Sequence, residues 1–318
     1  MRSPVSRTLE PTVGEVVFGP PGGHRPGERP ASGQSVPLVV LAGDPRETLL
    51  TGAESVSTEE GFVLSHAPGG LAGYAAAAPG LDLEAATRDL YRKLFKVSRG
   101  IHLYRIWNYV PQINVVCEGL ENYQRFCRGR SLTFEENFGR AFQDRLPAGS
   151  AVGTTGGSLI VCFVAGQAKP RYFENPRQVP AFEYPPDYGP RPPSFSRAAL
   201  VQTGRTIRLF VSGTAAIRGH ATVAPGQLEA QLKCTLENLR AIGESSGLGP
   251  VFGHGEPWTR SFKVYVRHPA DLPAVIAAFA ELPLRPADRV LYLQADICRS
   301  DLVLEIEAEL TRPAPSGS

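Results

Sequence analysis

The chain has 318 residues, of which 33 are lysine or arginine and 31 are aspartate or glutamate. This near balance favours neither nucleic acid nor an anionic membrane as a partner. No apolar run approaches the roughly 20 residues that cross a bilayer, and the N-terminus, MRSPVSRTLEPTVGE, lacks the apolar stretch of a signal peptide. We therefore expect a cytoplasmic protein.

The cysteines and histidines are scattered, without CxxC, HxH or HExxH spacing. We therefore expect no metal site, no disulfide framework and no cofactor-holding cluster. Four cysteines lie in apolar or helical contexts typical of small core residues, namely Cys117, Cys127, Cys162 and Cys234. Cys298 differs, because it lies in the polar interruption CRSD between two apolar runs.

Residues 1–34 are expected to form an irregular arm rich in proline and glycine, and residues 35–167 a first domain. Its helices are predicted from apolar residues at spacings of three and four, and its strands from apolar runs. The second helix is expected to break or bend near Gly129. In chain order the predicted elements are strands at 36–42, 61–65 and 71–78, a helix at 83–98, a segment at 101–116 that is a strand leading into a loop at Pro111, a helix at 120–142 and, after the turn GTTGG, a strand at 158–164.

A connector is predicted at residues 168–193, where prolines are too dense for regular secondary structure. It also carries several aromatic rings, among them Tyr184 and Tyr188, so we expect it to pack on the body rather than hang in solvent. The alternative is that the connector is a strap on the protein surface and that its aromatic rings serve only to anchor it.

The second domain is predicted at 194–312, followed by a tail at 313–318. Its elements are strands at 206–216, 260–267, 290–297 and 302–310 with helices at 227–244 and 272–282. In the last strand Leu304, Ile306 and Ala308 alternate with charged residues. Because side chains alternate between the faces of a strand, Glu305 is predicted to point away from the helix-packed core.

The two halves share one order of elements, which predicts an internal duplication. Aligning Leu159 with Leu302 places Cys162 where the second half has Glu305. If only one half keeps a carboxylate, the chain has one site. The predicted fold is α+β, with two duplicated sheets that each carry helices on one face.

Residues 194–310, with SFSRAALVQTGRTIRLFVSGTAAI and SDLVLEIEAEL, resemble the YjgF/RidA family, whose sheet packs two helices on one face as in chorismate mutase of the bacilli. Over residues 36–310 the chain resembles the chorismatase family. Five motifs in order carry this resemblance: YRIWNYVPQIN (104–114), YQRFCRGR (123–130), EYPPDYGPRPPSFSRA (183–198), VSGTA (211–215) and DICRSDLVLEIE (296–307). The resemblance implies an enzyme that takes chorismate and releases pyruvate from its enolpyruvyl ether.

Chorismate is a small dianion, so its site needs cations for two carboxylates and a proton donor at the ether. Within the family motifs Glu305 is implied as the catalytic acid and Cys298 as a thiol beside the ring. The residues implied in substrate binding are Tyr123, Arg130, Tyr184, Tyr188, Arg197 and Gly213. Taken singly, Arg130 and Tyr123 are better explained by a solvent-exposed arginine above a core tyrosine. For Cys298 the alternative is a buried packing thiol.

Gly213 with Cys298 resembles the family branch that forms 3-hydroxybenzoate, whereas alanines at these positions are typical of the branch that hydrolyses chorismate to a dihydroxycyclohexadiene acid. Two further alternatives are a YjgF/RidA-like deaminase of reactive imines and a non-catalytic metabolite-binding protein. We expect a monomer with its site in the cleft between the halves, since a duplicated chain supplies internally the contact that YjgF/RidA trimers make between subunits.

Overall fold

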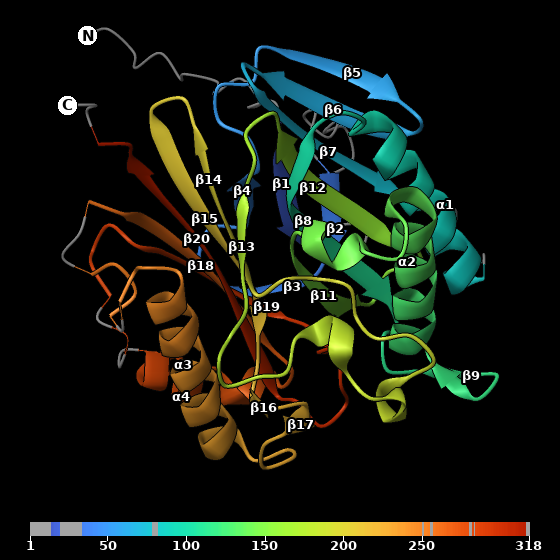
Figure 1. The fold of residues 1–318 in the computed structure, drawn as a ribbon. Coiled ribbons are helices and arrows are strands. Elements are labelled where there is room, and N and C mark those ends of the chain that lie inside the picture. The colour runs from blue at the N-terminus through green and yellow to red at the C-terminus, as the bar shows by residue number, and fades with distance from the viewer. Residues whose placement is uncertain are drawn as a thin grey trace, which may run out of the picture.

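The structure is a computed structural model that describes residues 14–19, 34–77, 82–249, 251–254, 257–279, 282 and 284–315. Two large β-sheets form the body of the protein, and each carries a pair of helices (Figure 1). The two pairs lie on different sides of the molecule, with the sheets between them (Figure 1). Within the described residues no helix is long and apolar enough to span a membrane.

The N-terminal sheet has the strand order β11-β8-β12-β7-β6-β5. Only β11 and β8 run parallel to each other. Its helices are α1 (Leu83–Val97), which Asp82 caps by accepting a hydrogen bond from the Ala85 backbone, and α2 (Asn122–Phe138). Its strands are β5 (Ser55–Glu59), β6 (Phe62–Ala67), β7 (Gly70–Ala76), β8 (His102–Pro111), β11 (Ala148–Thr154) and β12 (Ile160–Gly166).

The C-terminal sheet has the order β13-β14-β15-β20-β18-β19-β3, and only β18 and β19 are parallel. Its helices are α3 (Leu228–Ser245) and α4 (Leu272–Phe279). Its strands are β3 (Val39–Ala42), β13 (Arg171–Phe173), β14 (Ala198–Thr203), β15 (Thr206–Thr214), β18 (Thr259–Val266), β19 (Arg289–Gln294) and β20 (Leu304–Pro313).

Short elements complete the described chain. One small sheet, ordered β2-β1-β4, combines β1 (Glu15–Gly19), β2 (Gln34–Pro37) and β4 (Arg46–Thr48). The other short pieces are β9 (Val116–Cys117), β10 (Leu120–Glu121), β16 (Ile217–Arg218), β17 (Ala221–Thr222) and the 3-10 helices at Phe142–Arg145, Ala181–Glu183, Pro186–Tyr188 and Pro269–Asp271.

The duplication predicted from the sequence is present in the strand order. The run β5-β6-β7-β12-β8-β11 in the first sheet corresponds to β13-β14-β15-β20-β18-β19 in the second, and the parallel pair falls at the same place in both. The strand β3 is an addition to the second sheet. The predicted α+β fold with two related sheets is therefore confirmed.

The faces of the two sheets that carry no helices contribute to one shared core. Trp107 and Cys162 come to it from the first sheet, Phe210 and Tyr265 from the second, and Phe18 from the small sheet. Leu304 and Ile306 of β20 instead belong to the core under α3 and α4. Glu305 therefore points away from the helices, as the alternation predicts, and toward the other half.

A buried ion-pair cluster joins the two sheets inside this core. Arg105 Nη2 on β8 donates to the Glu307 carboxylate on β20 at 2.6 Å, and Trp107 Nε1 donates to it at 2.8 Å. Lys263 Nζ lies 2.7 Å from the same carboxylate. Burial opposes ionisation, but Lys263 and Arg105 hold the pKa of Glu307 below its usual value. Glu307 is therefore charged and compensated.

Several details differ from the expectation. Helix α2 is continuous at Gly129, where a Cβ would lie 2.7 Å from the Glu84 carbonyl of α1, so this glycine allows close helix packing rather than a bend. The predicted strand at 36–42 is divided: residues 36–37 end β2 of the small sheet, and Val39–Ala42 forms β3, which pairs with the sheet of the second half. Sequence patterning missed β11 and placed Cys117 in the core, whereas Cys117 is exposed.

The arm and the connector also contain regular structure. Residues 15–19 of the predicted arm form β1, and its other residues up to 33, apart from Gly14, lie outside the described chain. The connector was expected to have no regular structure, but Arg171–Phe173 pairs with β14 as an edge strand. As predicted, the connector packs on the body: Ala181 and Tyr184 are buried. Residues 316–318 of the predicted tail are not described.

Replacing Arg105 by methionine should lower the free energy of unfolding by about 3–5 kcal/mol, because the buried Glu307 carboxylate loses one of its cations. Chemical denaturation measures this loss. The matched control is Lys93→Met, which breaks the Lys93–Asp89 pair on the surface and should change stability by no more than about 1 kcal/mol. Equal losses of stability in the two variants would contradict the large contribution to the free energy of unfolding that we assign to the buried cluster.

Candidate active site

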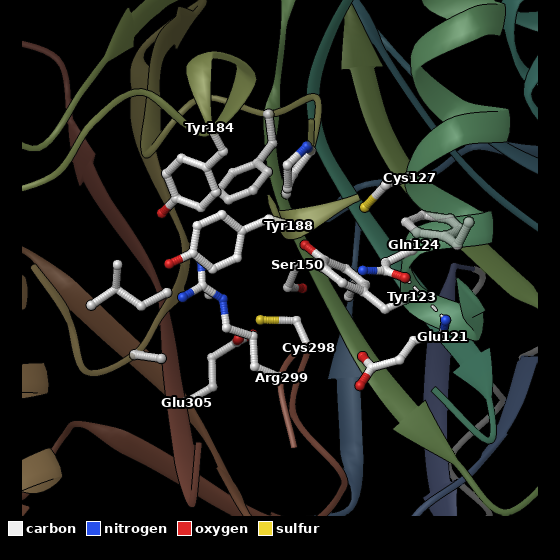
Figure 2. Close-up of a pocket in the computed structure, with 18 of the residues that line it drawn as sticks. Glu121, Tyr123, Gln124, Cys127, Ser150, Tyr184, Tyr188, Cys298, Arg299 and Glu305 are labelled. Atoms are coloured by element: carbon white, nitrogen blue, oxygen red, sulfur yellow. Dashed lines mark hydrogen bonds between the residues drawn. The ribbon is translucent and has the colours of Figure 1, made fainter. Parts of the chain in front are cut away.

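A cavity of about 250 Å³ lies between the two halves of the chain. Its walls come from α2 and β11 of the first half, from the connector, and from β15, β20 and the β19–β20 loop of the second half (Figure 2). The structure brings to this cavity every site residue predicted from the sequence: Tyr123, Arg130, Tyr184, Tyr188, Arg197, Gly213, Cys298 and Glu305. Their roles stay predictions.

Helix α2 supplies the wall from the first half. Tyr123, Cys127 and Arg130 line the cavity together, because spacings of four and seven put them on one helix face. Arg130 is 3% exposed, and its guanidinium lies among the rings of Tyr91 and Phe134, with the guanidinium carbon 5.4 Å and 5.7 Å from their centroids. Its Nε and Nη2 have no hydrogen-bond partner in the described chain.

The connector supplies a wall of two tyrosines. The rings of Tyr184 and Tyr188 lie with their centroids 5.6 Å apart. Arg197 Nη2 donates to the Tyr184 hydroxyl at 2.9 Å, and the Tyr188 hydroxyl lies 3.2 Å from Nδ1 of His220. Glu174 is the acid beside Arg197, with its carboxylate 3.8 Å from Nε. Arg197 is thus oriented and partly compensated before any ligand binds.

Glu305 lies in the wall from the second half and is 4% exposed. Burial raises the pKa of Glu305 to about 8, the nearby Glu307 charge adds to the increase, and Arg105 and Arg197 oppose it. Its Oε1 is buried without a hydrogen-bond partner among the described residues. Glu305 is therefore a protonated carboxylic acid at neutral pH with one oxygen unpaired.

Gly213 makes room for this acid. A Cβ at Gly213 would lie 1.9 Å from Glu305 Oε1 and 2.4 Å from the carboxyl carbon, so no larger residue fits while Glu305 keeps its position. The strand β15 shows a register irregularity between Val211 and Thr214, at this same place. The position of the Glu305 carboxyl group therefore requires glycine at position 213.

Cys298 lies beside Glu305 in the β19–β20 loop. Burial raises the pKa of Cys298 to about 12, and the Glu305 carboxyl adds to this. The thiol is therefore protonated at neutral pH, which makes it a weak hydrogen-bond donor rather than a nucleophile.

Some lining residues were missed by the sequence analysis. Arg299 follows Cys298 directly, and its membership of the motif DICRSDLVLEIE was the available signal. Ser150 and Gly149 also line the cavity and lie on β11. The sequence analysis did not predict this strand, because its residues were grouped with the turn that follows. Gln178 lies in the connector and donates to the Ile217 carbonyl at 3.0 Å. In Figure 2 Arg299 lies next to Tyr188 and Cys298, and Tyr123 and Gln124 lie on the other side of the view.

The arrangement is suited to a small anion that needs a proton. Arginines from α2, from the residue just before β14 and from the β19–β20 loop reach one cavity, and a neutral carboxylic acid lies among them. Low local polarity strengthens charge–charge attraction, and a raised pKa lets Glu305 donate its proton near neutral pH.

Comparison with known proteins gives the family. The family model described as "Chorismatase FkbO/Hyg5-like, N-terminal" matches residues 50–165. A 3-hydroxybenzoate synthase of Streptomyces hygroscopicus is 40% identical over 70% of this chain and 68% of its own length. A chorismatase of Streptomyces rapamycinicus is 36% identical over 80% of this chain and 79% of its own length. A crystal structure of a chorismatase superposes with a TM-score of 0.77 at 29% identity, covering 97% of this chain and 95% of that one. The chain belongs to the chorismatase family.

The raised pKa of Glu305 gives a stability prediction. The folded state holds this proton up to about pH 8, whereas an unfolded chain releases it near the usual value of 4.5. The wild-type protein should therefore lose stability relative to Glu305→Gln by about 1.4 kcal/mol per pH unit over that interval, since glutamine does not titrate. Denaturation at pH 5.5 and pH 7.5 measures the difference. A gap between the two proteins that does not grow with pH would refute the pKa assignment.

Proposed function

We propose that this protein converts chorismate to 3-hydroxybenzoate and pyruvate. The observation that carries the proposal is the protonated, partly unpaired Glu305 in a cavity lined by arginines, which matches a dianionic vinyl ether that needs a proton. The related 3-hydroxybenzoate synthase, at 40% identity, supports this product.

In the proposed reaction Glu305 protonates the terminal methylene of the enolpyruvyl group, which leaves a cation stabilised by the ether oxygen. The ring hydroxyl then displaces the arm at the neighbouring ring carbon, and pyruvate leaves with the ether oxygen as its keto oxygen. The proton of that hydroxyl returns to Glu305. The epoxide that results opens, loses a ring proton and regains one on oxygen, giving 3-hydroxybenzoate. No water is consumed.

The chain's own residues hold the reactants for these steps. Arg130 and Arg197 bind carboxylates, since their guanidinium groups are buried and still have N–H groups free. Tyr184 and Tyr188 form an apolar wall that excludes water, which matters because water would capture the same cation. The protonated thiol of Cys298 lies beside Glu305, where it donates toward the oxygen of the intermediate.

The alternative product is the dihydroxycyclohexadiene acid formed when water attacks instead. Two relatives, at 37% and 36% identity, carry the name chorismatase, which does not specify the product and is compatible with this alternative. Gly213 favours 3-hydroxybenzoate, because a methyl group there would displace Glu305 and change the space beside the ring. We also propose that the enzyme acts as a monomer in the cytoplasm without metal or cofactor. These remain predictions, which light scattering, cell fractionation and activity in the presence of a chelator test.

Incubating the protein with chorismate and separating the products should give pyruvate and 3-hydroxybenzoate in equal amounts. Glu305→Gln should lower kcat by about 10²–10⁴-fold, because the amide has no proton to donate. The exposed Glu118→Gln is the control and should keep wild-type rates. Chorismate left intact by the wild-type protein would refute the function, and undiminished pyruvate release by Glu305→Gln would refute the role of Glu305.

Gly213→Ala should lower the rate of pyruvate release by about 10²-fold, since the new methyl group forces the acid out of its position. We also expect some of the product to become the non-aromatic diene acid, seen as a second peak in the same chromatogram. Gly157→Ala is the control, because nothing lies within 4 Å of a Cβ at that position. An unchanged rate and product would mean that Gly213 does not hold Glu305 in place.

A further inference from the structure

The three arginines of the cavity differ in how far the protein already compensates them. Arg197 has Glu174 beside it and uses Nη2 for the Tyr184 hydroxyl and for the Val179 carbonyl, at 3.2 Å. In the described part of the chain, no carboxylate lies within 4.0 Å of the guanidinium of Arg130 or of Arg299. The cavity therefore holds two uncompensated cations, one on α2 and one on the β19–β20 loop.

The guanidinium of Arg299 is oriented but little used. It lies over Tyr188 at 4.0 Å from the ring centroid and over Tyr184 at 5.4 Å. Nη1 donates to Thr222 Oγ1 at 3.1 Å. A guanidinium has five N–H donors in a flat fork that matches a carboxylate. Stacking thus fixes the plane of the fork and leaves N–H groups for a ligand.

The backbone of this loop is held by Arg267, at the end of β18. Its Nε donates to the Leu302 carbonyl at 2.7 Å, and its Nη2 donates to the carbonyl of Arg299 itself at 2.9 Å. Asn114 of the first half donates to the Ile297 carbonyl at 3.1 Å. The position of Arg299 is therefore fixed at both ends of the side chain, which is the preorganisation that a binding residue needs.

The surroundings of Arg299 identify the part of the substrate that it meets. Arg299 and Arg197 both lie against the ring of Tyr184, at 5.4 Å and 5.9 Å. Glu305, Arg197, Cys298 and Arg299 line the same cavity. Arg197 is close enough to Glu305 for its charge to lower the pKa of that acid, and Cys298, next to Arg299, lies beside the Glu305 carboxyl group. In an enolpyruvyl ether the methylene that receives the proton is bonded to the carbon that bears the arm's carboxylate. The cations beside the acid must therefore be those that meet this carboxylate.

We propose that Arg299 binds the carboxylate of the enolpyruvyl arm, sharing it with Arg197, while Arg130 on the opposite wall takes the ring carboxylate. This inference rests on the proposed function. It assigns a substrate contact to a residue outside the predicted set and divides the two charges of the substrate between the halves of the protein. Arg267 is a positioning residue, because it acts only through the loop.

The test is equilibrium binding by calorimetry in the Glu305→Gln background, where turnover is slow. In that background Arg299→Met should weaken binding of chorismate by about 10- to 100-fold, the loss of a hydrogen-bonded charge pair. Binding of 3-hydroxybenzoate, which keeps only the ring carboxylate, should be unchanged. Arg130→Met should weaken both ligands. Arg299→Lys, which keeps the charge and loses the stacked fork, should retain part of the chorismate affinity.

The outcomes separate this inference from the function. Chorismate binding that Arg299→Met leaves intact, or an equal loss for both ligands, would overturn the assignment while the function stands. No chorismate binding by Glu305→Gln itself would overturn the function and this inference with it. Thermal unfolding of each variant identifies misfolding, and the retained 3-hydroxybenzoate affinity expected for Arg299→Met is a second proof that its cavity is intact.

Discussion

Two carboxylates on one strand face, two residues apart, define the electrostatics of this protein. Glu305 and Glu307 both turn inward from β20, and both are nearly fully buried. Glu307 accepts hydrogen bonds from Arg105 and Trp107 and forms an ion pair with Lys263. Glu305 Oε1, in contrast, accepts no hydrogen bond in the described chain. Burial is the main reason that Glu305 keeps its proton; the negative charge of Glu307 adds to the increase in its pKa, and Arg105 opposes it. The ion-pair cluster joins the sheets and neutralises Glu307, whereas the neighbouring Glu305 stays buried and protonated.

The site depends on the duplication having diverged. The first half supplies α2 with Arg130, the second supplies Glu305 and the Arg299 loop, and the connector adds the tyrosines. In the first half Cys162 lies in the shared core on β12, the strand equivalent to β20. A thiol packs there without the cost of a buried charge, and burial raises the pKa of that thiol well above its usual value. At these equivalent positions the first half therefore has a residue that only packs in the core, whereas the second half has the protonated acid Glu305, whose Oε1 has no hydrogen-bond partner in the described chain.

Much of this arrangement follows from local sequence patterns. The alternation of Leu304 and Ile306 with acids predicts the inward face of Glu305, and the spacing of Tyr123 and Arg130 predicts one helix face. Partners distant in the chain were not accessible in this way. Arg105 sits in an apolar strand, and nothing local indicates that Glu307, some 200 residues away, neutralises it. The apolar residues at 36–42 correctly predicted extended structure, but their division between β2 and β3 and the pairing of β3 with the distant β19 have no local signal. The need for glycine at position 213 follows from the nearby Glu305 carboxyl group, which a Cβ there would approach to 1.9 Å, and no spacing rule reveals this.

The short strand β13 has a consequence for how the chain can be divided. By its prolines, the connector resembles a linker whose removal would leave two intact domains. Yet Arg171–Phe173 is the edge of the second sheet, Asn175 donates to the Asn238 carbonyl on α3, and Val179 bonds to Gly219. The connector is thus built into the second half over most of its length. Fragments made for complementation should be cut between Gly166 and Arg171, because a cut after the prolines would strip the second fragment of its outer strand and of the tyrosine wall.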